Sequence, residues 1–145
     1  MSVKFIVVSH GRFSEGIVDS VQMLTGQQED LVYYGLFPEQ TTDVLREKLE
    51  EEIKNTPEGV EIVFLSDIFH GSPFNAIVDL TRDYKFYHFT GINLGLMIVA
   101  VMDRVLGKGA EEICRNLLVE LPGTVMYVND MLEANNDDDD DDEED

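Results

Sequence analysis

Four short apolar runs, each followed by a helical pattern, constrain the fold of this chain more than any other feature. The runs lie at residues 3–8, 31–37, 60–65 and 86–92. They are rich in β-branched and aromatic side chains and too short for buried helices, which is typical of parallel strands buried on both faces. This alternation predicts an α/β fold, with an open, mostly parallel sheet of four strands and helices on both faces.

The helical patterns between these runs have recognisable ends. Ser14 is expected to cap the first helix, which Gly26 ends. Ser72 as N-cap, with Pro73 at the first helical position, is a strong start signal for the helix after the third strand. Further helices are expected to begin after Thr41 or Thr42 and to cover residues 94–106 and 110–121.

A fifth apolar segment, residues 124–128, follows the turn at Pro122 and Gly123. The preceding helix already covers the core, so this segment has no place in the middle of the sheet. We therefore expect it to return as a C-terminal antiparallel strand at a sheet edge, on its own sheet or on that of a partner chain.

The net charge of −20 is unevenly distributed along the chain. Residues 137–145 are nine consecutive acidic residues, which leaves −11 on the other 136 residues. Such a run repels itself and buries nothing, so we expect one domain over residues 1–132 and a disordered acidic tail over residues 133–145. The net acidity, without a cluster of Lys and Arg to neutralise phosphates, speaks against nucleic-acid binding.

Cysteine usage and hydropathy indicate the compartment. The single cysteine, Cys114, rules out an intramolecular disulfide and fits a reducing cytoplasm. No apolar run approaches the roughly 18 residues of a membrane span, and the N-terminus has no signal-peptide pattern. We therefore expect a cytoplasmic protein in which Cys114 is a small buried hydrophobic side chain rather than a nucleophile.

Two of the predicted strands end in an ionisable side chain just before a turn. These are His10, followed by Gly11 at which the chain can turn sharply, and Asp67. In a doubly wound sheet the first and third strands are commonly neighbours at the ligand-binding switch point, so we expect His10 and Asp67 to lie a few ångströms apart. The carboxylate would accept one ring N–H, fix the tautomer of His10 and leave the other nitrogen as a nucleophile.

The predicted helix start at Ser72 supplies a third part of this site. Free N–H groups at a helix N-terminus, together with the Ser72 hydroxyl, form an anion site with a favourable dipole. An oriented nucleophile, its carboxylate and a cradle for a negative group are the parts expected for phosphoryl transfer through histidine.

Three segments of the sequence carry a resemblance to a known family. They are Val7-Val8-Ser9-His10-Gly11, Phe64-Leu65-Ser66-Asp67 and Gly71-Ser72-Pro73-Phe74-Asn75-Ala76. Over roughly residues 2–130 the chain resembles the mannose-family IIA domain of the bacterial phosphoenolpyruvate-dependent sugar phosphotransferase system (PTS). The Gly91-Ile92-Asn93 turn is also similar to that of the family.

The resemblance implies a phosphocarrier. The histidine that matches His10 is phosphorylated on a ring nitrogen by the carrier protein HPr and passes the phosphoryl group to the IIB component, so that the membrane components IIC and IID are met only indirectly. Asp67 matches the orienting carboxylate of the family, and Ser72 lies in the loop that contacts the phosphoryl group. The family uses no metal and no cofactor, and its members are homodimers that exchange a C-terminal strand, which would explain residues 124–128.

Further residues are expected to bind the phosphoryl group or to form the rim of the site. They are Gly11, Arg12, His70, Gly71 and Pro73. Position 70 departs from the family, where relatives often have Gly, and we interpret this second candidate histidine as a rim residue near the partner. The third histidine, His88, is interpreted as structural because it sits mid-strand between aromatic residues. The acidic tail is a further departure, and without a IIB-like region we expect a free-standing IIA subunit.

Two other functions stay open at this point. A phosphatase with a histidine nucleophile usually needs a neighbouring Arg and a second His; Arg12 is close in sequence, but no further Arg follows a strand end. A regulatory module controlled by phosphorylation at His10 would have an identical site, although no effector domain is attached. The sequence identifies neither the sugar nor the acceptor residue on IIB.

Overall fold

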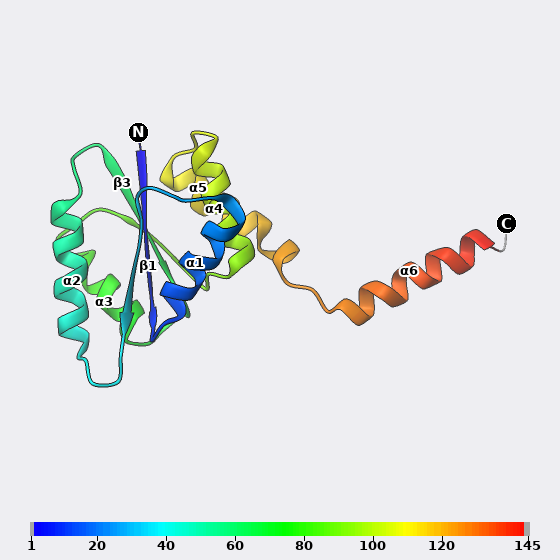
Figure 1. Cartoon of the computed structure of the whole chain (residues 1–145), viewed down its shortest axis with the longest axis horizontal. Coiled ribbons are helices and arrows are strands. Elements are labelled where there is room, and N and C mark those ends of the chain that lie inside the picture. Colours follow the sequence, from blue (N-terminus) through cyan, green and yellow to red (C-terminus); the bar gives the residue numbers. More distant parts are fainter. Residues whose placement is uncertain (1, 144–145) are drawn as a thin grey trace.

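The computed structural model describes residues 2–143, with side chains up to residue 137. Its sheet contains four strands: β1 (Ser2–His10), β2 (Leu31–Leu36), β3 (Val60–Ser66) and β4 (Tyr87–Thr90). All neighbouring strands pair in parallel, in the order β2-β1-β3-β4 (Figure 1). The predicted α/β fold with a four-stranded parallel sheet is therefore confirmed.

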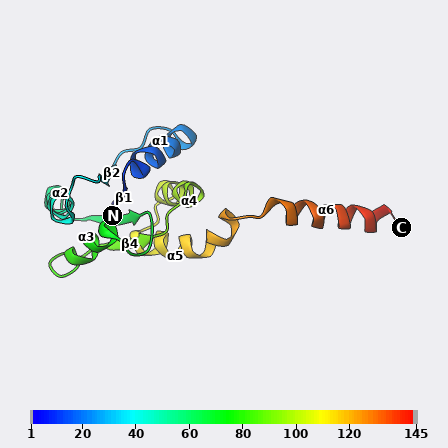
Figure 2. The same cartoon turned by 90° about the horizontal axis from the view of Figure 1, so that it is seen from below.

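Helices cover both faces of the sheet (Figure 2). One face carries α1 (Phe13–Thr25), α4 (Leu94–Val105) and α5 (Ala110–Glu120), and the other carries α2 (Thr42–Asn55) and α3 (Ser72–Leu80). Side chains alternate along β1, so that Phe5 and Val7 belong to the first core and Ile6 and Val8 to the second. This double burial is the reason that the strands read as continuous apolar runs.

The helix ends agree with the sequence except at two caps. Thr41 caps α2 with its side chain, as expected. Ser14 lies inside the first turn of α1 instead of capping it, because its hydroxyl donates a hydrogen bond to the carbonyl of Tyr34 at 2.9 Å. Gly71, with a φ of 97°, is the N-cap of α3, and Ser72 is the first helical residue.

The C-terminal segment differs from the predicted edge strand. Residues 124–128 form the end of a short 3-10 helix η1 (Leu121–Thr124), an extended link and the start of α6 (Val128–Glu143). Asn93 donates its side-chain N–H to Thr124 Oγ1 at 3.1 Å, which holds the end of η1 at the start of α4. The chain then runs away from the sheet (Figure 1). A strand needs a neighbouring strand to pair with, and the segment is led away from the strands of its own chain.

The predicted acidic tail is also helical as far as the structure describes it. Residues 133–143 belong to α6, and residues 144–145 lie outside the described residues. The expectation of disorder relied on the mutual repulsion of the acidic side chains and on the lack of side chains to bury, and it stays a prediction. The division of the chain at residue 132 stays a prediction.

Candidate active site

The candidate site lies at the carboxyl ends of β1 and β3. These strands are direct neighbours, and Val8 is paired with Ser66, so the residues that follow leave the sheet side by side. The chain turns away from β1 at Gly11, which has a φ of 54° and donates its N–H to the carbonyl of Leu36 at 2.8 Å. The end of β1 lies next to the loop that precedes α3.

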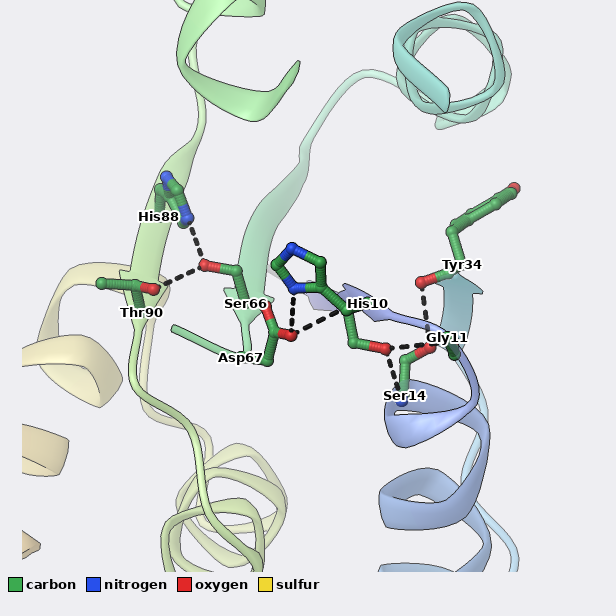
Figure 3. A network of polar contacts seen from close by, with 9 residues as sticks. His10, Gly11, Ser14, Tyr34, Ser66, Asp67, His88 and Thr90 are labelled. Atoms are coloured by element: carbon green, nitrogen blue, oxygen red, sulfur yellow. Dashed lines mark hydrogen bonds and ion pairs between the residues drawn. The ribbon is translucent and has the colours of Figure 1, made fainter. Parts of the chain in front are cut away.

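His10 and Asp67 are joined by two hydrogen bonds (Figure 3). Asp67 Oδ2 accepts the backbone N–H of His10 at 2.9 Å and lies 2.8 Å from His10 Nδ1. A carboxylate is an acceptor, so Nδ1 carries the proton and Nε2 is left with a free lone pair. The predicted juxtaposition of these two side chains is confirmed.

The two partners differ in exposure and in electrostatics. The side chain of His10 is 48% exposed, whereas that of Asp67 is 11% exposed. Burial opposes ionisation of Asp67, but the hydrogen bonds from His10, the backbone N–H of Ile68 and the charge of His10 together outweigh it, and the pKa of the carboxyl lies below its usual value. Its second oxygen, Oδ1, is buried and accepts no hydrogen bond within the described part of the chain. An ionised carboxylate thus orients an imidazole whose other nitrogen is accessible.

The loop before α3 lies close to this free nitrogen. A Cβ atom at Gly71 would lie 3.2 Å from His10 Nε2 and 3.0 Å from its Cε1, so the backbone approaches the ring more closely than a side chain would permit. Ser72, the next residue, begins α3, and the N-cap Gly71 supplies no side-chain hydrogen bond to the first turn. The positive end of the helix dipole therefore adjoins the free nitrogen of His10.

The remaining predicted rim residues are only partly brought together. His70 lies in the loop next to Gly71, with a φ of 75° that is unusual for a residue other than glycine, and its ring stacks on Phe69 with centroids 3.7 Å apart. Pro73 is buried in the first turn of α3. Arg12 instead lines a surface hollow with Tyr33 on the α1 face of the sheet. The arginine that a histidine phosphatase would need is therefore not on the α3 face, where His10 lies.

A second polar network lies beside Asp67, and sequence reasoning missed it. Ser66 Oγ donates to Thr90 Oγ1 at 2.8 Å and lies 2.7 Å from His88 Nε2 (Figure 3). Burial lowers the pKa of His88 to about 4, so the ring is neutral at physiological pH. The sequence does contain a sign of this network: three polar residues lie on one face of two adjacent strands, within otherwise apolar runs.

Two further features that support the turn after β1 were also missed. A Cβ atom at Gly35 would overlap the carbonyl oxygen of Gly11, so β2 can approach the turn only with glycine at this position. On the other side, Ser9 Oγ accepts the backbone N–H of Ser14 at 2.7 Å and ties the start of α1 to the end of β1. A glycine inside a predicted strand was the visible sign of the close approach.

Other reactive groups of the described chain do not form a competing site. Cys114 packs against the core, and burial together with the nearby Glu111 raises the pKa of its thiol to about 11. Among the residues whose side chains the structure describes, 2–137, no group of three His, Cys, Asp or Glu is arranged to hold a metal ion. None of the helices in this part of the chain has the length and apolar character needed to cross a membrane.

Comparison with known proteins identifies the family. The family model EIIA-man, described as "PTS system fructose IIA component", matches residues 4–118. The chain belongs to this family. It is thus a IIA component of the mannose family of the PTS, as the sequence motifs indicated.

Individual relatives agree with the family assignment. The PTS system fructose-specific EIIA component of Bacillus subtilis is 30% identical over 97 residues, which are 66% of this IIA chain and 66% of that protein. The PTS system mannose-specific EIIAB component of Escherichia coli is 27% identical over 105 residues, 72% of this chain but only 32% of that protein. The crystal structure of the phosphotransferase system component EIIA from Streptococcus agalactiae superimposes with a TM-score of 0.79 at 25% identity, over 88% of this chain and 98% of that one.

Proposed function

We propose that this IIA protein is a phosphocarrier in which His10 accepts a phosphoryl group from phosphorylated HPr and passes it to a IIB component, for coupled uptake and phosphorylation of a sugar. The observation that carries the proposal is the 2.8 Å contact between His10 Nδ1 and Asp67 Oδ2, which leaves Nε2 free beside Gly71. The match of residues 4–118 to the IIA family supports it.

The chemistry follows from the tautomer of His10. The lone pair of Nε2 attacks the phosphorus of the phosphorylated donor; an N–P bond forms at Nε2 while the bond between phosphorus and the donor side chain breaks and its electron pair stays on the donor atom. No proton has to leave Nε2. The ring of His10 becomes cationic, and the ionised Asp67 stabilises this charge through Nδ1–H. The same steps in reverse transfer the group to IIB.

The start of α3 is the proposed cradle for the phosphoryl oxygens. Its N-terminal N–H groups and the Ser72 hydroxyl follow directly after Gly71, where an added Cβ atom would lie 3.2 Å from the attacking nitrogen. Donors that are already oriented stabilise the charge of the transition state without reorganisation. This arrangement suits phosphoryl transfer to a nitrogen nucleophile.

The proposed partners dock at the open side of His10. The loop between Asp67 and Gly71 presents Ile68 and Phe69 with 54% and 62% of their surface exposed. Exposed apolar side chains next to a reactive atom are suited to contact with a protein partner. We propose that HPr and IIB use this rim in turn, with His70 at its edge. The cytoplasmic location expected from the cysteine content stays a prediction.

We also propose a homodimer in which the C-terminal segment pairs with the sheet of a second copy. Val125 already has extended backbone angles, with a φ of −124° and a ψ of 128°. The side chains of residues 125–128 are exposed and apolar, and β4 is an edge strand. Exchange of this segment would bury the apolar side chains and extend the sheet beyond β4. Sedimentation analysis should therefore give a dimer that Tyr127→Asp converts to a monomer.

The proposed function is tested by phosphorylation with phosphoenolpyruvate, enzyme I and HPr, followed by intact mass and site mapping. We expect one acid-labile phosphoryl group on His10, absent in His10→Ala, whose substitution at an exposed position should leave the fold intact. His70→Ala is the matched control and should be labelled like the wild type. No label on the wild type, with active partners, would refute the carrier function; a label on His70 would move the nucleophile.

A further inference from the structure

We infer that His88 is a positioning residue for phosphoryl transfer, which acts through Ser66 and Thr90 to fix the end of β3 and so the carboxylate that orients His10. The inference rests on the proposed phosphocarrier function and deepens it. It extends the sequence-based interpretation of His88, which assigned the ring a structural role only.

The hydrogen bonds of the network are directional. Ser66 is fully buried, and its single hydroxyl proton is donated to Thr90 Oγ1. The 2.7 Å contact with His88 therefore requires His88 to donate its Nε2–H to Ser66 Oγ. Ser66 and Thr90 are also direct partners in the β3–β4 ladder. His88 is thus the donor that begins a chain of side-chain bonds across the ends of two strands.

Asp67 depends on this strand end for its position. Both hydrogen bonds that its Oδ2 accepts come from His10, and Oδ1 has no partner in the described chain. The carboxylate is therefore held by His10 and by its own backbone, which continues directly from Ser66. The carbonyl of Ser66 accepts the N–H groups of Gly91 and Ile92 at 3.1 and 3.2 Å. Main chain and side chain of Ser66 together fix the point from which Asp67 projects.

His88 also touches the element that carries the anion cradle. Its ring packs against Phe74, with centroids 5.2 Å apart and an interplanar angle of 41°. Phe74 lies in the first turn of α3, two residues after Ser72. One ring therefore braces both the strand end that holds Asp67 and the helix start that adjoins Nε2 of His10. Displacement of either by a fraction of an ångström changes the alignment on which transfer depends.

The test compares His88→Leu with His88→Gln. Leucine has a similar size but no donor, whereas the amide of glutamine can place an N–H near the position of Nε2. We expect His88→Leu to slow phosphoryl transfer from saturating phosphorylated HPr about 10-fold, and His88→Gln to stay within about 3-fold of the wild type. Asn116→Leu is the matched control, because it removes a 2.7 Å hydrogen bond to Asp103 on the other side of the core and destabilises the protein without touching the site.

A second readout is independent of transfer. The Nδ1–H proton of His10, bonded to Asp67, gives an NMR resonance whose shift and exchange rate report that bond. We expect the resonance to move or broaden in His88→Leu, and to be retained in His88→Gln and Asn116→Leu. If His88→Leu does not fold, Thr90→Val, which is isosteric and removes the acceptor for Ser66, is measured in its place.

The outcomes separate this inference from the proposed function. If the wild type accepts no phosphoryl group, the carrier function fails, while the NMR signature still tests positioning. Wild-type rates and an unchanged His10 resonance in His88→Leu, or equal losses in the leucine and glutamine variants, would overturn the role of His88 alone. Loss of rate in Asn116→Leu equal to that in His88→Leu would assign the effect to stability.

Discussion

The two ends of the sheet use polar side chains in opposite ways. At the amino end, Arg104 of α4 donates hydrogen bonds to the carbonyls of Val3, Glu29 and Asp30 and to the side chain of Gln28, at 2.7 to 3.2 Å. Its guanidinium also lies 4.7 Å from the centroid of the Phe5 ring. At the carboxyl end, His10 uses one ring nitrogen for Asp67 and leaves the other open.

This difference distinguishes a structural polar group from a reactive one. The partners of Arg104 all come from this chain, so its hydrogen bonds contribute to stability and leave little capacity for a ligand. Only one ring nitrogen of His10 has a hydrogen-bond partner in the fold. The carboxylate fixes that nitrogen, and the glycine at position 71 gives access to the other. Substitutions at the amino end should therefore change stability, and substitutions at the carboxyl end should change rate.

The largest effect is expected for Asp67→Asn. Under the proposed function, loss of the negative charge removes the group that would stabilise the cationic ring of phosphorylated His10, and transfer from phosphorylated HPr should slow by about 1,000-fold. Asp79→Asn, which removes a surface carboxylate 3.3 Å from Arg46, is the control and should transfer at the wild-type rate. The rate is measured by rapid quench, and a small effect of Asp67→Asn would mean that orientation by the backbone suffices.

At the opposite end of the sheet, Arg104→Met should lower the free energy of unfolding by about 4 kcal/mol, because several hydrogen bonds from a charged donor are lost together. The rate of transfer by the folded fraction should stay within about 2-fold of the wild type. Urea denaturation and the transfer assay test the two parts. A rate defect in fully folded Arg104→Met would show that the two ends are not independent.

The pH dependence of stability should reveal His88. Its pKa is lowered by burial to about 4 in the folded state, so between pH 6.5 and 4 the unfolded chain binds more protons and stability falls as the pH decreases. From pH 7 to pH 5 this amounts to about 2 kcal/mol, which His88→Gln should abolish. Comparing the two proteins by urea denaturation cancels the contributions of the carboxylates. Parallel curves for both proteins would contradict the burial of a neutral ring.

The smallest effect is expected for removal of residues 135–145. Figure 1 shows α6 directed away from the body, and the segment is mostly acidic. Transfer from HPr and to IIB should be unchanged in the truncated chain, measured as single-turnover rates. A large loss of the rate to IIB, with the rate from HPr intact, would identify the tail as a docking element for IIB.

The sequence predicted those parts of the fold and site that depend on local pattern and on sheet topology. Continuous β-branched runs identified the four strands, and the position of strand ends in a parallel sheet predicted that His10 lies next to Asp67. The resemblance of three short segments to the mannose-family IIA domain was sufficient for the family assignment. The strand pattern and the family motifs each extend over several neighbouring residues, so one wrongly interpreted position does not change the predicted fold or family.

The parts that could not be predicted depend on single contacts between distant residues. Whether Ser14 caps a helix or bonds to the carbonyl of Tyr34 is decided by the neighbouring strand and not by the helix sequence. Arg12 is next to Gly11 in sequence, yet the turn directs it to the other face of the sheet. The strand predicted over residues 124–128 has a strand-like composition, but a strand also needs a partner edge, which one chain does not supply at that place.

The neighbouring positions of β1 and β3 have a consequence for the order in which this protein is made. His10 and Asp67 are 57 positions apart in the chain, and β2 lies between them in sequence but on the far side of β1 in space. A nascent chain on the ribosome that has released only β1 and β2 carries the nucleophile without its carboxylate. Under the proposed function, His10 would therefore become reactive only when β1 gains its second neighbour, β3, and a chain that ends before Asp67 would not divert phosphoryl groups from the donor.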